Sequence, residues 1–217
     1  MFERDYLMRL INQTARMVGI IMGLREQKKP QEALELIDEF LSRELRLKTR
    51  IAMGLSDEDL LAMLSVGGVP NAESVAVIAA MLQEEGELLD DLGRPEDSAP
   101  RYFKALRLNL HVLTNYGEID GWDVGDRAER LLRLLAPYEW DAETVRSVWQ
   151  WHERTGRLAD AEDRLYELWE KGGASPADGD GFYDRLAKLD DDALEAGGLS
   201  RAELEEGVRQ WHRLAKE

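Results

Sequence analysis

The 217-residue sequence predicts an all-α protein built from antiparallel helical hairpins. Three observations predict this fold. Apolar residues recur at steps of three and four along most of the chain, which is the period of an amphipathic helix. Proline, glycine and serine–acid pairs stand where helices begin and end. A turn pattern also returns three times at nearly constant spacing.

The first 41 residues predict a helical hairpin. Between Tyr6 and Met22 the apolar residues form one helical stripe, and a short polar turn follows. Pro30 suits the first position of a second helix, because its missing N–H would have no partner there. Apolar residues from Ala33 to Leu41 continue that helix.

Later helix starts follow the same rules. Ser74–Ile78 has the composition of a strand, but the apolar run continues to Leu82 and then into acidic residues without a turn, so a helix capped by Asn71 is predicted. Ser56 with Asp59, and Ser200 with Glu203, have the spacing of a capping box. No segment is predicted to be β.

Three segments are predicted to be loops: 66–71, about 116–123, and 172–181. Within the last, Asp178–Gly181 resembles the start of a calcium loop but lacks its third ligand and its glycine register, so a flexible acidic loop is predicted. This segment would separate a helical domain, residues 1–172, from a C-terminal helical cap, residues 173–217, packed on the same domain. Asp190–Asp192 is expected at a helix N-terminus, where negative charge is favoured.

The turn pattern repeats around Lys28, Gly93 and Gly156, at two nearly equal intervals. Each interval is about twice the 34-residue period of tetratricopeptide repeats. Ala33 and Ala161 stand five residues after the first and the third turn, where the helices would approach closely. The sequence therefore predicts a tetratricopeptide-like, right-handed stack of hairpins. Glu85 departs from this pattern, because it stands where the repeat has a large apolar residue.

Along nearly its whole length the chain also resembles a family of uncharacterised bacterial proteins with tetratricopeptide-like helices. The segments that carry the resemblance are Met1–Arg9, Gly86–Gly93, Thr155–Arg157 and Leu194–Leu199. The resemblance implies the helical fold. It implies no activity and no functional residues.

Charge and composition narrow the classes of function. The net charge is −16, and residues 54–217 hold 36 of the 44 acidic but only 18 of the 28 basic side chains. Such a surface repels polyanions, so no nucleic-acid partner is expected. The chain has no cysteine, no run of about 20 apolar residues and no positively charged leader. A cytoplasmic protein without a membrane partner is predicted.

No catalytic, metal or cofactor site is predicted, and whether the protein is an enzyme stays open. His111, His152 and His212 lack a second ligand at metal spacing. There is no phosphate-binding loop and no nucleophile elbow. No carboxylate is surrounded by apolar residues in a way that predicts a raised pKa.

The main hypothesis is a non-catalytic protein-interaction module. In stacked hairpins the first helices line a concave groove. That groove would be mainly acidic and would suit a basic protein or peptide. Counting from the three turns, its predicted residues are Met22, Arg25, Gln83, Glu87, Asp90, Arg146, Gln150 and Glu153.

The alternative hypothesis is a homodimer formed through the first helix. Gly19 and Gly23 form a small-xxx-small step, which indicates close helix packing either between subunits or within one chain. Trp149 and Trp151, two residues apart on a helix, cannot both face one core, so one of them is expected against another element or a partner. A small-ligand binder or enzyme is the third hypothesis.

Overall fold

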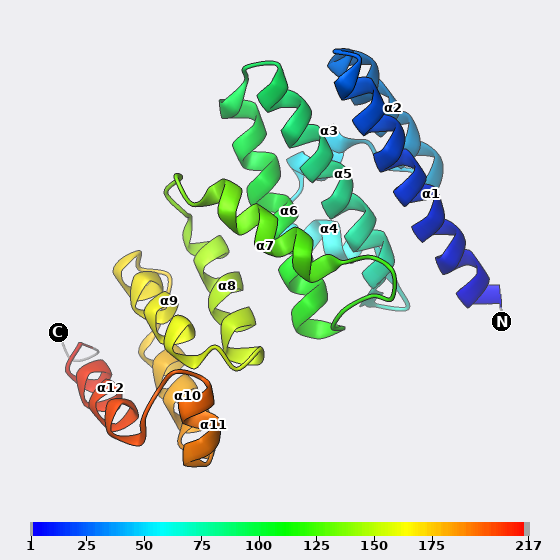
Figure 1. The fold of residues 1–217 in the computed structure, drawn as a ribbon. Helices are drawn as coiled ribbons and strands as arrows, with labels where there is room; N and C mark the ends of the chain where they lie inside the picture. The colour runs from blue at the N-terminus through cyan, green and yellow to red at the C-terminus, as the bar shows by residue number, and fades with distance from the viewer. Residues whose placement is uncertain (1, 215–217) are drawn as a thin grey trace. The chain divides into compact units, whose positions relative to one another are not determined.

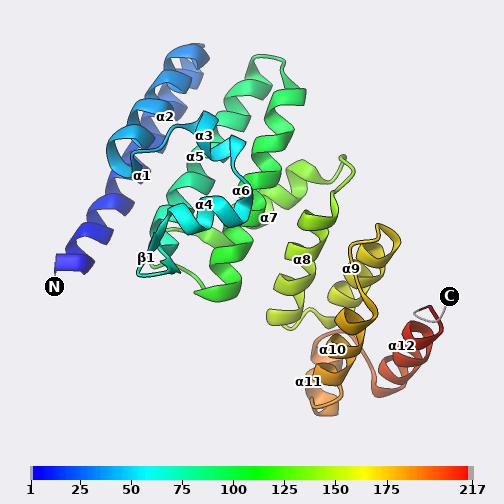
Figure 2. The ribbon, with the colours of Figure 1, turned by 180° about the vertical axis from the view of Figure 1, so that it is seen from behind.

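The computed structural model describes the backbone of residues 2–214 and the side chains of residues 8–214. Over these residues the chain forms twelve helices and one short two-stranded hairpin (Figures 1 and 2), which confirms the all-α prediction. The elements are α1 (Phe2–Glu26), α2 (Pro30–Leu45), α3 (Thr49–Gly54), α4 (Asp57–Met63), β1 (Ser65–Val66), β2 (Val69–Pro70), α5 (Ala72–Asp91), α6 (Pro95–Asn115), α7 (Val124–Leu135), α8 (Ala142–Arg154), α9 (Leu158–Glu170), α10 (Pro176–Leu186), α11 (Asp191–Ala196) and α12 (Arg201–Leu214).

The chain divides into two compact units, residues 1–138 and residues 139–217. The first unit contains α1 to α7, and the second contains α8 to α12. The predicted domain boundary at residues 172–173 falls inside the second unit, between α9 and α10. None of the helices in the described part of the chain combines the length and apolar character needed to cross a bilayer.

Three helix pairs, α1–α2, α5–α6 and α8–α9, are joined by the same turn. Its central residue adopts a left-handed backbone, with φ of 59° at Lys28, 70° at Gly93 and 75° at Gly156. The next amide donates to the carbonyl five residues earlier, over 2.9 Å in all three turns. This closure satisfies carbonyls that the end of a helix leaves without a partner. The three predicted turn positions are therefore confirmed.

Helix α5 is the centre of the first unit. Every residue from Val75 to Leu89 is buried, because α5 packs against α1, α2, α6 and α7. Gly86 makes the contact with α6 possible, since a Cβ atom there would lie only 2.5 Å from Cε1 of Tyr102. As predicted, the helix is capped by Asn71, whose side chain accepts the amide of Ser74.

A β-hairpin occupies the segment that was expected to be only a loop. Ser65 pairs with Pro70 and Val66 pairs with Val69 in antiparallel register. Gly67 and Gly68, with φ of 62° and 82°, form the two-residue turn, and a turn with positive φ at both positions matches the twist of paired strands. The prediction that no segment is β is wrong at this point.

The second unit has its own aromatic core. Trp149, Phe182 and Trp211 belong to one buried cluster with leucines from α9 to α12. Trp151 lies outside that cluster, and the Arg157 guanidinium stacks over its ring at 3.9 Å. The two tryptophans thus have different surroundings, as their spacing predicted.

The predicted loop at 172–181 is wrong beyond residue 175, where α10 begins. Ser175 and Asp178 form a capping box, with the Asp178 carboxylate accepting from the Ser175 amide at 2.8 Å. Asp178–Gly181 is therefore helical, not a flexible acidic loop. Glycine at position 179 allows the close approach of the Trp211 ring, because a Cβ atom there would lie 1.8 Å from that ring. Backbone flexibility is not what requires it. The capping box at Ser200 and the Asp190 cap of α11 are confirmed. Ser56 caps α4 by accepting the Asp59 amide at 3.0 Å, but the Asp59 carboxylate accepts from the Ser56 hydroxyl and not from its amide.

No described residue packs closely against Gly19 or Gly23. A Cβ atom at either position would meet no other group within 4 Å. Close packing inside the same chain, one of the two interpretations of these glycines, is therefore wrong.

The same substitution should have opposite effects at two helical glycines of the first unit. Gly86→Ala should destabilise it by about 1–3 kcal/mol, because the new methyl group overlaps the buried Tyr102 ring. Gly19→Ala should stabilise α1 by up to about 1 kcal/mol, since alanine favours the helix and has open space there. Urea denaturation of both variants and wild type measures the difference. Two shifts of the same sign would contradict this account of the two sites.

Candidate functional site

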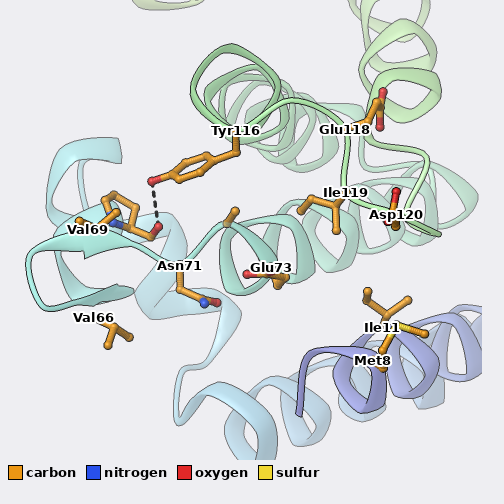
Figure 3. A pocket seen from close by; sticks show the side chains of 12 residues that line it. Met8, Ile11, Val66, Val69, Asn71, Glu73, Tyr116, Glu118, Ile119 and Asp120 are labelled. Carbon is orange, nitrogen blue, oxygen red and sulfur yellow. Dashed lines mark hydrogen bonds between the residues drawn. The ribbon is translucent and has the colours of Figure 1, made fainter. Parts of the chain in front are cut away.

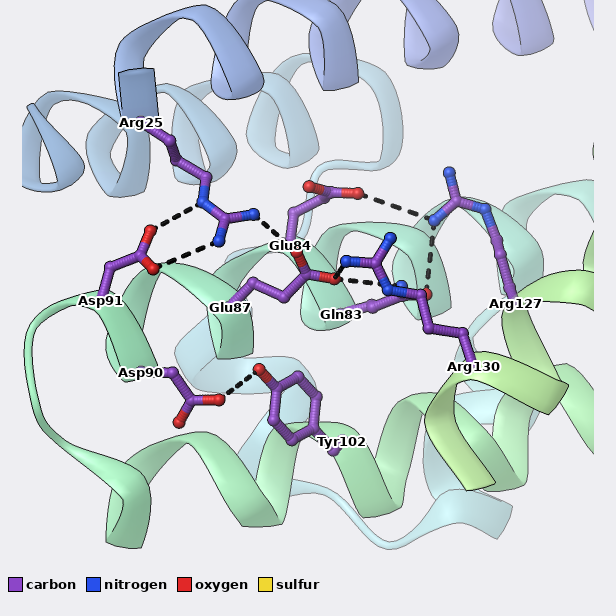
Figure 4. A network of polar contacts seen from close by, with 9 residues as sticks. All are labelled: Arg25, Gln83, Glu84, Glu87, Asp90, Asp91, Tyr102, Arg127 and Arg130. Carbon is purple, nitrogen blue, oxygen red and sulfur yellow. Dashed lines mark hydrogen bonds and ion pairs between the residues drawn. The ribbon is translucent and has the colours of Figure 1, made fainter. Parts of the chain in front are cut away.

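Four of the predicted groove residues meet around one cavity in the first unit. Met22 and Arg25 come from α1, and Gln83 and Glu87 come from α5. The cavity has a volume of about 290 Å³, and α7 and the residue before it close its third side (Figure 4). The remaining lining residues are Val18, Glu84, Asp123, Asp126, Arg127 and Arg130.

The other predicted residues lie elsewhere. Asp90 follows Glu87 on α5 but does not line the cavity. Arg146, Gln150 and Glu153 lie on α8, in the second unit. There Glu153 accepts from Arg185 at 2.5 and 2.9 Å, and Arg146 pairs with Asp178 at 3.2 Å.

Arg25 joins α1 to α5 through two carboxylates. Its Nε donates to Asp91 Oδ2 at 2.7 Å, and one terminal nitrogen donates to Asp91 Oδ1 at 3.2 Å. Its other terminal nitrogen donates to Glu87 Oε2 at 2.5 Å. A planar guanidinium matches such a pair of acceptors, so Arg25 fixes the rotation of α1 on α5.

Glu87 lies between two arginines. Its second oxygen, Oε1, lies 2.7 Å from a terminal nitrogen of Arg130 on α7 and accepts from Gln83 Nε2 at 3.3 Å. Arg25 and Arg130 thus hold one buried carboxylate from two sides (Figure 4). The interaction links three helices through a single charge.

Glu84 is less completely neutralised. Its oxygen lies 3.7 Å from Arg127, and its side chain is buried. Burial, reinforced by the charge of Glu87, raises the pKa of Glu84 above its ordinary value. Burial also raises the pKa of Glu85, whose carboxylate pairs with Arg101 at 3.1 Å. The expectation that no carboxylate has a visibly raised pKa is therefore wrong.

Asp90 is bound within the chain as well. Its carboxylate accepts from the Tyr102 hydroxyl at 2.7 Å and from the hydroxyl of Ser98. Burial raises the pKa of the Tyr102 hydroxyl, and the hydrogen bond to Asp90 raises it further. The two acids that were expected to face a basic partner, Glu87 and Asp90, thus already have partners in α1, α6 and α7.

The cavity keeps two exposed carboxylates on α7 and the residue before it. Asp123 and Asp126 line it, and neither side chain makes a hydrogen bond or ion pair with the described residues. They share a helix face with Arg127 and Arg130, because the four positions are three, one and three residues apart. That spacing is a sequence signal for the α7 side of the cavity. The position of Glu85 in the repeat is a signal for the buried acids.

The surroundings of these acids do not form a metal centre. Among the described residues, no group of three or more histidine or carboxylate side chains is placed to hold a metal ion. Arginines occupy the directions from which a cation would approach Glu87. The arrangement can hold helices together and can present Asp123, Asp126 and Met22 to a ligand.

Comparison with known proteins gives one match. A family model described as a family of unknown function, DUF6483, covers residues 1–216. The chain belongs to this family. No curated protein and no solved structure matches this DUF6483 chain significantly.

Replacing Glu84 by glutamine should change the pH dependence of stability. Because the folded state raises the Glu84 pKa, wild type binds more protons when folded than when unfolded at pH above the ordinary value of about 4.5. Stability therefore falls as pH rises through this window. Glu84→Gln removes that loss, so the variant should be more stable than wild type at pH 7, with the difference shrinking towards pH 4.5.

Urea denaturation between pH 4.5 and 8 tests this expectation. Glu58→Gln, at an exposed position in the first turn of α4, serves as the control and should follow the wild-type profile. A Glu84→Gln variant that loses stability relative to wild type as pH rises would contradict the assignment.

Proposed function

We propose that this protein is a non-catalytic interaction module whose first unit binds a segment of a partner protein in the groove between α1, α5 and α7. One observation carries the proposal: α1 and α5, the first helices of two hairpins with the same turn, contribute side chains to one cavity. Proteins of stacked hairpins bind their partners on such surfaces.

The repeated turn supports a tetratricopeptide-like stack. Its three copies are separated by two nearly equal intervals. Each interval is long enough to hold one degenerate repeat after the hairpin that precedes it. Helices α3 and α4 with the β-hairpin follow the first, and α7 follows the second. The absence of cysteine and the acidic surface fit a reducing bacterial cytoplasm, which we propose as the location.

The partner that best fits the groove carries a basic residue beside an apolar one. Asp123 and Asp126 are exposed, lie in or next to the first turn of α7, and are separated from the buried acids by Arg127 and Arg130. Met22 is 54% exposed and offers an apolar contact on the α1 side. A lysine or arginine would pair with the aspartates, while Glu87 stays bound to Arg25 and Arg130.

Peptide selection tests this function. A phage library of random dodecamers selected on the wild-type protein should yield sequences enriched in lysine and arginine. The double variant Asp123→Asn, Asp126→Asn removes two charges and keeps residues that suit their backbone positions. It should bind the selected peptides about tenfold more weakly than wild type does. Glu58→Gln with Glu96→Gln, two exposed acids in the first turns of other helices, is the matched control.

Peptides that bind the aspartate variant and wild type equally would overturn this groove as the site. A selection without basic enrichment would overturn the proposed partner chemistry.

A homodimer is the second candidate function. Gly19 and Gly23 lie in the C-terminal third of α1, yet no contact among the described residues requires a glycine at either position. Ile20, beside them, is 47% exposed. A second α1 approaching this face would explain both features, because small residues allow close helix contact.

Light scattering at several protein concentrations tests the dimer. Wild type should gain mass with concentration, and Ile20→Glu should remain monomeric. A wild-type protein that stays monomeric at every concentration would exclude this function.

A further inference from the structure

A second, larger cavity lies at the other end of α1 from the groove. It has a volume of about 620 Å³, and its walls come from the N-terminal half of α1, the β-hairpin, the start of α5 and the loop after α6 (Figure 3). Its apolar lining consists of Met8, Ile11, Val66, Val69, Pro70, Ala72 and Ile119. We name this surface the hairpin groove.

The hairpin presents two valines to solvent. Val66 and Val69 are directly opposed across the two strands, so their side chains lie on the same face of the hairpin. They are 71% and 59% exposed, although valine is usually buried. A contiguous exposed apolar patch of this kind is typical of an interaction site.

The valines are held in place rather than carried on a loose loop. The Tyr116 hydroxyl donates to the Pro70 carbonyl at 2.9 Å, which ties the hairpin to the end of α6. The Asn71 amide donates to the Leu64 carbonyl at 3.0 Å and closes the base of the hairpin. The surface is therefore largely formed before any partner arrives, which lowers the entropic cost of binding.

Among the described residues, the charged groups that line the hairpin groove are all acidic. They are Glu73, Glu118 and Asp120. The Glu118 carboxylate accepts the amides of Val124 and Gly125 at 3.1 and 2.8 Å, so it is already occupied as a cap of α7. Glu73 and Asp120 make no hydrogen bond or ion pair with the described part of the chain.

This charge pattern differs from that of the groove between α1, α5 and α7. There, Arg25, Arg127 and Arg130 neutralise the buried acids. In the hairpin groove, Asp120 is exposed and Glu73 is half-buried, and both lie beside an apolar floor. A basic and apolar partner is the complement of that combination, because cations would pair with Glu73 and Asp120 while apolar side chains cover the valines.

We propose that the hairpin groove is a docking site for a partner segment that places apolar side chains on Val66 and Val69 and lysine or arginine beside Glu73 and Asp120. The site is separate from the groove of the proposed function. A macromolecular segment fits better than a small ligand, because the exposed valines extend the apolar surface beyond the cavity itself (Figure 3).

The test uses two fluorescently labelled amphipathic peptides, each about five helical turns long, one of leucine and lysine and one of leucine and glutamate. Fluorescence anisotropy on the full-length protein should show binding of the leucine–lysine peptide and at least about tenfold weaker binding of the leucine–glutamate peptide. The double variant Val66→Thr, Val69→Thr keeps the branched side-chain shape that suits strands. It should bind the leucine–lysine peptide about tenfold more weakly than wild type does. The double variant Glu73→Gln, Asp120→Asn should bind the leucine–lysine peptide severalfold more weakly, and this binding should depend less on salt concentration.

Matched controls separate this surface from general attraction to an acidic protein. Ile51→Thr with Met63→Gln removes two other exposed apolar side chains, and Glu58→Gln with Glu96→Gln removes two other exposed acids. Both controls should bind like wild type. Asp123→Asn with Asp126→Asn reports on the other groove, so the failure of one site does not hide the behaviour of the other.

Equal binding of the two peptides, or wild-type binding by the valine variant, would overturn the proposal. A wild-type dimer in light scattering that the valine variant abolishes would also overturn it, in favour of a second copy of this chain. A leucine–lysine peptide that fails to bind at all would exclude the site.

Discussion

The burial of helix α5 from Val75 to Leu89 is the constraint on which the first unit depends. Its apolar half, Val75 to Leu82, is enclosed by neighbouring helices, and the burial continues through Gln83, Glu84, Glu85 and Glu87. Leaving an ionised carboxylate unpaired in such surroundings costs several kcal/mol, on the order of 3–5 kcal/mol. The helices that cover this half of α5 must therefore supply cations between them, or a carboxylate stays protonated.

The neighbouring helices meet this requirement in different ways. Arg25 from α1 and Arg130 from α7 neutralise Glu87, and Arg101 from α6 neutralises Glu85. Glu84, with only Arg127 at 3.7 Å, has a raised pKa. Buried ion pairs add little net stability compared with apolar packing, but their geometry selects one arrangement over others. These pairs fix how α1 and α7 are rotated on α5, and this rotation creates the cavity between them.

Sequence reasoning reached the parts of the fold that local chemistry determines. The caps at Ser56, Asn71, Asp190 and Ser200 could be predicted because each involves residues three apart. The repeated turn could be predicted because its left-handed residue recurs at a regular interval. Contacts between distant residues could not be predicted in this way. Arg25 and Glu87 are 62 residues apart, and nothing in either segment indicates the other. Gly179 illustrates the same limit, because glycine in an acidic stretch has the composition of a loop, whereas here it makes room for Trp211 from a later helix.

The hairpin at residues 65–70 is a different case. A Gly-Gly pair between two valines is a local signal for a two-residue turn, so this element was predictable in principle.

The two grooves of the first unit show why a count of acidic residues does not identify a binding surface. Both are lined by carboxylates, so both have the composition expected for a basic partner. In the groove between α1, α5 and α7, two of the four lining carboxylates, Glu84 and Glu87, are buried with α5 and already pair with arginine. A partner there can use only what remains, Asp123 and Asp126. In the hairpin groove Glu118 caps α7, whereas Glu73 and Asp120 make no hydrogen bond or ion pair with the described residues and lie beside exposed valines. The carboxylates available to a partner are therefore those that do not already pair within the fold. Which carboxylates these are depends on which ones the helices bury.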